Sequence, residues 1–170
     1  MSMIEIFNKL KATPSRNEKE KILAKHKDDL VFQRVIYLAL DPHTQFYQRK
    51  IPDYTPAKKN QADSLDSVLD SLYNLSSRQC TGNAAIEFLK KLLSSLTEDD
   101  AKVLELVIQK DLDCGVQSST ANKIWAGLIS DYPCMLASGY EERLVEKIQF
   151  PAFVQLKMDG MRFNAIVDAL

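Results

Sequence analysis

The chain has 170 residues, of which 45% are apolar, and its formal net charge is −1. This length fits one domain, or one domain and part of a second, and the apolar fraction is ample for a folded core. The near-zero charge excludes a global field that attracts nucleic acid, no apolar run reaches the ~18 residues of a membrane span, and no signal peptide is visible.

The charges are unevenly distributed along the chain. Residues 1–60 carry twelve Lys or Arg against seven Asp or Glu, whereas residues 61–113 carry five against ten. Any contact with DNA must therefore use a local patch or backbone amides. Three cysteines without a Cys-x-x-Cys pair and two isolated histidines indicate neither a metal site nor a disulfide framework. Reduced thiols are typical of an intracellular protein.

The first 130 residues are predicted to be helical. Capping sequences at residues 2–5 and 15–18 each open an amphipathic stretch. A strongly apolar helix is expected over residues 30–40, and Phe46 and Tyr47 are expected in a short helix after it.

Residues 49–63 contain two prolines and several lysines and are predicted to form a basic loop. This loop is either a solvated connection or a clamp on DNA phosphates. Leu65, Val68, Leu69 and Leu72 then predict an amphipathic helix.

Arg78 and the run Thr81-Gly82-Asn83 precede a helix predicted over residues 84–96. Thr81 or Asn83 can cap this helix through its side chain. A helix N-terminus preceded by glycine also leaves amides that suit a phosphate. The residues alone leave both interpretations open.

The next helix is capped by Thr97 and is expected to end at a left-handed stop at Gly115. Ser118 or Ser119 opens a further helix that carries Trp125. Two helices joined by a glycine turn can grip a duplex backbone. The alternative is a helical hairpin that buries Trp125 in the core. The donors expected for DNA are Lys110, Asn122 and Lys123.

Composition changes near residue 130, where a linker is expected, followed by a short helix over residues 140–147. The run from Lys157 to Arg162 reads Lys-x-Asp-Gly-x-Arg and lies between two strand-like stretches, which predicts a β-hairpin. Lys157 and Arg162 then face each other. Opposed like charges destabilise a sheet unless an anion lies between them, and phosphate is the obvious candidate. The alternative is a surface hairpin with two solvated cations.

The motif also favours nucleophilic chemistry. A lysine amine attacks only when it is neutral, and a fixed guanidinium nearby favours the neutral form. Arg162 keeps its proton and can clamp a phosphate.

Lys-x-Asp-Gly-x-Arg resembles the adenylation motif of the covalent nucleotidyltransferases, which are ATP-dependent DNA ligases, RNA ligases and mRNA capping enzymes. Together with residues 80–87, 111–115, 121–125 and 135–138, it is similar to the DNA ligases of T-even-type bacteriophages. The resemblance implies a mainly α chain. An all-helical DNA-binding domain would span 1–129, and a linker and the start of an α+β adenylation domain, opening with the hairpin, would span 130–170. RNA ligases and capping enzymes do not usually carry such a helical domain.

The resemblance implies an ATP-dependent DNA ligase that seals nicks in duplex DNA through a lysine–AMP intermediate, with Mg²⁺, in replication, repair and recombination. Lys157 would be the nucleophile, and Arg162, Gln155 and Leu156 would hold the nucleotide. No metal ligand is assigned. The residues expected to contact DNA are Arg78, Thr81, Gly82, Asn83, Lys110, Gly115, Ser118, Ser119, Asn122 and Lys123.

Later motifs of the family are absent from the 170 residues, so we expect a truncated ligase without activity of its own. The alternative is a non-catalytic helical module that binds duplex DNA. The expected partners are nicked double-stranded DNA and ATP. We expect a monomer in the cytoplasm, which is the host's cytoplasm if the source is a phage.

Overall fold

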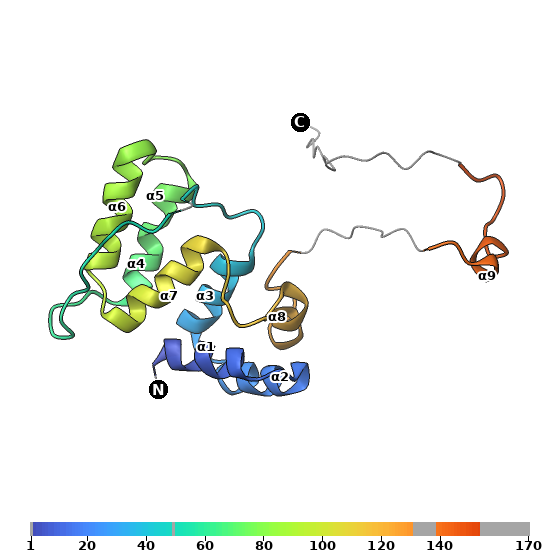
Figure 1. The fold of residues 1–170 in the computed structure, drawn as a ribbon, viewed down its shortest axis with the longest axis horizontal. Coiled ribbons are helices and arrows are strands. Elements are labelled where there is room, and N and C mark those ends of the chain that lie inside the picture. Colours follow the sequence, from blue (N-terminus) through green and yellow to red (C-terminus); the bar gives the residue numbers. More distant parts are fainter. Residues whose placement is uncertain (1, 49, 131–138, 154–170) are drawn as a thin grey trace. The chain divides into compact units, whose positions relative to one another are not determined.

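The computed structural model describes residues 2–48, 50–130 and 139–153, and its regular structure within these ranges is entirely helical (Figure 1). The mainly α prediction is thus confirmed for the described residues. The chain divides into two compact units, Met1–Tyr132 and Pro133–Leu170. The described part of the first unit contains α1 (Met3–Ala12), α2 (Arg16–Lys25), α3 (Leu30–Leu40), α4 (Leu65–Ser71), α5 (Tyr73–Ser76), α6 (Gly82–Ser94), α7 (Glu98–Gln109) and α8 (Ser118–Ile124).

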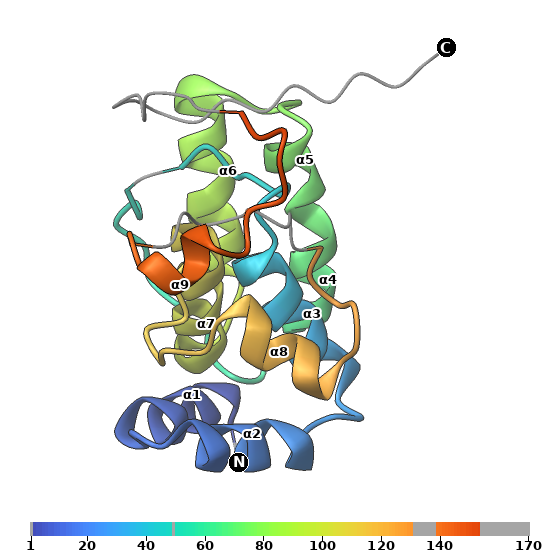
Figure 2. The ribbon, with the colours of Figure 1, turned by 90° about the vertical axis from the view of Figure 1, so that its right-hand side faces the viewer.

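Helix α7 lies at the centre of the first unit, where α1, α3, α4 and α6 all pack against it (Figures 1 and 2). Its sequence accounts for this place. Thr97 caps the helix by accepting a hydrogen bond from the backbone amide of Asp100. Carboxylates fill the first turn, where the helix dipole favours negative charge. The apolar residues buried along α7 are Ala101, Val103, Leu104, Val107 and Ile108.

A second part of the core joins α8 to α3. The ring centroids of Phe32 and Trp125 are 6.1 Å apart, and those of Phe7 and Phe32 are 5.6 Å apart. The indole N–H of Trp125 donates to the carbonyl oxygen of Lys27 at 3.0 Å. Trp125 is therefore a core residue whose one polar atom is satisfied.

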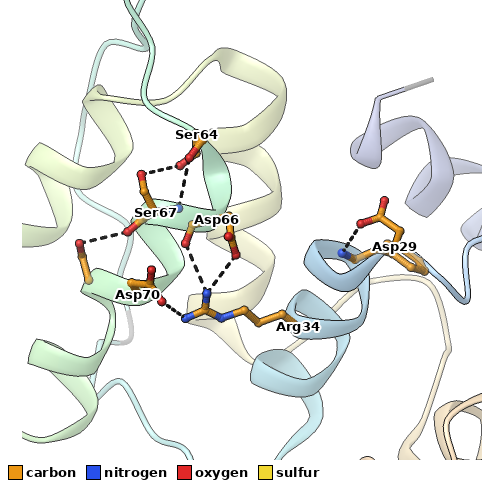
Figure 3. Close-up of polar contacts among 8 residues, drawn as sticks. Asp29, Arg34, Ser64, Asp66, Ser67 and Asp70 are labelled. Carbon is orange, nitrogen blue, oxygen red and sulfur yellow. Dashed lines mark hydrogen bonds and ion pairs between the residues drawn. The ribbon is translucent and has the colours of Figure 1, made fainter.

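Figure 3 shows the polar contacts where α3 meets α4. The guanidinium of Arg34 donates to the carboxylates of Asp66, at 3.0 Å, and Asp70. Asp29 and Ser64 cap the N-termini of the two helices by accepting hydrogen bonds from backbone amides three residues further on. Both helices therefore start at residues that can satisfy their first-turn amides.

Several details of the predicted helices are wrong. Phe46 and Tyr47 are not helical, because Phe46 turns into the core and Tyr47 adopts a φ of 57°. Helix α6 begins at Gly82, two residues earlier than expected. Helix α7 ends with Lys110 in the left-handed conformation rather than at Gly115, because the backbone N–H groups of Lys110 and Asp111 donate to the carbonyl oxygens of Val107 and Leu106 and close the helix there. Gly115 has a φ of +65°, but it lies in the following loop.

The described part of the second unit, residues 139–153, holds one short helix, α9 (Glu142–Val145). It is shorter than the helix predicted over residues 140–147. The strands predicted around Lys157 lie almost wholly outside the described residues. No helix among the described residues is long and apolar enough to cross a membrane.

The cap of α3 can be tested directly. We expect Asp29→Ala to lower the free energy of unfolding by about 1 kcal/mol, whereas Asp29→Asn keeps an acceptor oxygen and retains most of the stability. Urea titrations followed by circular dichroism measure both. Asp28→Ala is the matched control, because Asp28 is exposed and precedes the capping position. Equal losses at the two positions would contradict the capping role.

Candidate nucleic-acid interface

Four residues predicted to contact DNA, Arg78, Thr81, Gly82 and Asn83, are exposed at the start of α6. Thr81 occupies the N-cap position, but its side chain makes no capping hydrogen bond with the described residues. Gly82 has a φ of +58°, and the space where a Cβ would lie is open. The first turn of this 13-residue helix is therefore accessible and electropositive, which suits an anion.

Arg78 lies against the aromatic ring of Tyr47, a residue that was not predicted to contact DNA. Its guanidinium carbon is 5.0 Å from the ring centroid of Tyr47. Tyr47 is 61% exposed, so the pair lies on the surface. The position of Tyr47 next to the predicted basic loop is the sequence signal that could have identified it. Tyr47 was instead predicted to be part of a short helix.

A second cluster surrounds Gly115. A cavity of about 230 Å³ is lined by residues from two distant stretches: Pro14, Arg16, Lys19, Gly115, Gln117, Ser119 and Thr120. The amine of Lys19 donates to the carbonyl oxygen of Cys114 at 2.7 Å, and the guanidinium of Arg16 donates to the hydroxyl of Ser119 at 3.4 Å. A Cβ at position 115 would lie 2.9 Å from the Lys19 amine, so the glycine makes room for this cation.

Helix α8 begins at Ser118, one of the two serines predicted to open it, but neither Ser118 nor Ser119 occupies its N-cap position. The N-cap residue is Gln117, and Ser118 is half-buried in the first turn. Ser119 is exposed at the cavity beside Gly115. Arg16 and Lys19 were missed from the sequence because they precede this loop by about a hundred residues.

Lys110 is engaged inside the fold. Its amine donates to the carbonyl oxygens of Leu38 and Asp41, each at 2.6 Å, and lies 5.8 Å from the ring centroid of Phe46. Burial lowers the pKa of Lys110, and the nearby Asp41 carboxylate opposes this shift. The amine thus satisfies carbonyls at the C-terminus of α3, where the helix dipole favours a cation. The Lys110 amine is therefore occupied within the fold, and we do not include it in the DNA contact.

Asn122 and Lys123 also have internal partners. The Asn122 amide donates to the carbonyl oxygen of Ile129 and accepts from its backbone N–H, both at 2.9 Å. The Lys123 amine lies 2.6 Å from a carboxylate oxygen of Glu20. This hydrogen bond lowers the pKa of Glu20. Arg16 also forms an ion pair with the Glu20 carboxylate. Glu20 therefore stays ionised and offsets part of the positive charge beside the Gly115 cavity.

The residues predicted for adenylation, Gln155, Leu156, Lys157 and Arg162, lie outside the described residues. In the ranges that the structure describes, no three His, Cys, Asp or Glu side chains come together to hold a metal ion. The described candidate site is thus made of the exposed turn at residues 78–83 and the Gly115 cavity. No hydrogen bond or ion pair among the described residues joins the two.

The chain is 40% identical to the DNA ligase of Enterobacteria phage T4 and 40% identical to that of Enterobacteria phage T6. Each match covers 97% of this chain and 34% of the relative, so the chain spans about a third of the length of these relatives. The solved structures "Pmar-Lig_Pre." and "Pmar-Lig_PreS3" match with TM-scores of 0.64 and 0.62 at 32% and 30% identity. Each of these two matches covers 71% of this chain and 28% of the chain in the solved structure. No protein-family model matches the chain.

The internal role of Lys110 predicts a loss of stability. We expect Lys110→Met to lower the free energy of unfolding by about 1–3 kcal/mol, because two carbonyls lose their donor. Lys102→Met is the control: Lys102 is exposed and pairs with Glu98 one turn away, and such a solvated contact contributes little to stability. Urea denaturation measures both variants. A Lys110 variant as stable as the Lys102 variant would show that these hydrogen bonds contribute little.

Proposed function

We propose that this chain, which is related over nearly its whole length to the DNA ligases of phages T4 and T6, supplies the DNA-binding part and the first adenylation motif of an ATP-dependent DNA ligase. The 40% identity over 97% of the chain carries this proposal. The similarity is not confined to the helical unit, which ends at Tyr132. We assign DNA binding to residues 1–129 and the linker and start of the adenylation domain to residues 130–170.

The proposed DNA contact is to the sugar-phosphate backbone. It is supported by the exposed turn of Arg78, Thr81, Gly82 and Asn83, where a cation and an uncapped helix N-terminus lie together. The Gly115 cavity is the second proposed contact, through Arg16 and Ser119. Backbone contacts need no base-specific readout, which is what an enzyme that seals nicks in any sequence requires.

The proposed chemistry belongs to Lys157. Its neutral amine would attack the α-phosphate of ATP, forming a phosphorus–nitrogen bond as pyrophosphate leaves. Arg162 would hold the nucleotide phosphate, and Gln155 and Leu156 would line the adenine side. AMP would then pass to the 5′-phosphate at a nick. The 3′-hydroxyl would attack this phosphate and displace AMP, which joins the two strand ends. Magnesium would neutralise phosphate charge, and we assign it no ligand in this chain.

A helical duplex-binding module without catalysis is the second candidate function. The described residues alone fit it equally well, because they are helical and contain no part of the Lys157 motif. The relatives favour the ligase, since both carry that name.

DNA binding predicts a measurable dependence on salt. We expect the chain to bind nicked duplex at low salt and Arg78→Ala to reduce the slope of log affinity against log salt by about one unit. We expect Lys123→Ala to leave the slope nearly unchanged, because Glu20 already pairs with Lys123. Fluorescence anisotropy at several salt concentrations gives the slopes. Absence of binding at low salt would exclude the DNA contact.

The lysine chemistry can be tested in a chimera. We would replace the matching third of phage T4 DNA ligase with this chain and incubate it with labelled ATP and magnesium. We expect covalent label on the chimera and nick sealing, with both abolished by Lys157→Ala. Lys147→Ala is the control, because Lys147 is exposed in the same unit of the chain. Label that persists in a folded Lys157 variant would contradict the assigned nucleophile.

A further inference from the structure

Tyr47 and Arg78 form an unusual exposed pair. Their φ angles are 57° and 59°, so both non-glycine residues adopt the left-handed backbone conformation. The Arg78 guanidinium carbon lies 5.0 Å from the Tyr47 ring centroid. Left-handed backbone is unfavourable for residues with a Cβ and persists only where surrounding structure imposes it.

The fold imposes this conformation from both sides. Phe46 is 2% exposed, and the Lys110 amine lies 5.8 Å from its ring centroid, so the chain before Tyr47 is anchored in the core. The backbone N–H of Arg78 donates to the carbonyl oxygen of Leu75 at 3.1 Å, at the end of α5. Phe46 thus points inward and Tyr47 points outward, toward Arg78.

The ring of Tyr47 also borders the proposed DNA-binding surface. It lines two surface cavities of about 600 and 590 Å³. The second includes Ile86, from the second turn of α6, and Lys50. In both ribbon views the segment after α3 runs past α5 and α6 (Figures 1 and 2). Tyr47 therefore shares a cavity with the second turn of α6, the helix whose N-terminus Gly82 leaves open.

We infer that Tyr47 is a positioning residue for Arg78 in DNA binding, an inference that rests on the function proposed above. The guanidinium is planar, and its N–H donors lie in its plane. The Tyr47 ring lies against the Arg78 guanidinium and restricts this side chain, while the donors make no hydrogen bond with the described residues and stay available to phosphate oxygens. Tyr47 thereby reduces the conformational freedom that Arg78 loses on binding.

A double-mutant cycle tests this inference. Dissociation constants for nicked duplex are measured for the wild type, Tyr47→Ala, Arg78→Ala and the double variant. We expect Tyr47→Ala to weaken binding about two- to fivefold, the range of an exposed cation–π contact. In the Arg78→Ala background the same change should have no further effect. Tyr47→Phe keeps the ring and should bind like the wild type.

Two further variants separate positioning from folding. Tyr47→Asn removes the ring with a residue that tolerates left-handed backbone, and we expect it to match Tyr47→Ala in binding. Tyr73→Ala is the matched control, because Tyr73 is 65% exposed on α5, and it should not change the affinity.

Each outcome is decisive. Failure of the wild type to bind at low salt removes the proposed function and this inference with it. If the wild type binds but Tyr47→Ala does not weaken it, only the role of Tyr47 is overturned. A loss in Tyr47→Phe equal to that in Tyr47→Ala overturns positioning by the ring, and additive losses in the double variant do the same.

Discussion

Burial of α7 is the constraint on which the rest of the helical unit depends. Four other helices pack against it, so its apolar residues fix where their ends emerge on the surface. At the C-terminus of α7, the Lys110 amine donates to the last carbonyl oxygens of α3 and so ties the ends of the two helices together. The turn before α6 and the loop that contains Gly115 are therefore carried by a rigid frame, the usual arrangement for binding loops.

Local sequence features predicted the helical frame well. Thr97 caps α7 as expected, and the apolar run over residues 30–40 matches α3, because these features depend on neighbours within one or two turns. The helical prediction failed at Tyr47, where burial of the preceding residue overrode local preference. The glycine stop was misplaced because Lys110 itself adopts the left-handed conformation that ends α7, and its amine contacts a carbonyl oxygen 72 positions earlier in the chain, which the local sequence does not reveal.

The candidate site was only partly predictable for the same reason. Sequence shows which residues can donate to phosphate, but not which are already occupied. Lys123 pairs with Glu20, which lies 103 positions away, whereas the Arg78 guanidinium contacts an aromatic ring and forms no hydrogen bond or ion pair with the described residues. A chain of net charge −1 can thus still present a local cation on its surface, where that cation has no acidic partner in the described part of the fold.

Trp125 has a consequence of a different kind. It is the single tryptophan of the chain, and its indole lies in the core with its N–H bonded to the Lys27 carbonyl oxygen. Unfolding would move this ring from an apolar interior into water, where indole emission shifts to longer wavelength. The chain therefore carries an intrinsic optical reporter at the junction of α2, α3 and α8, which follows the integrity of that region without any added label.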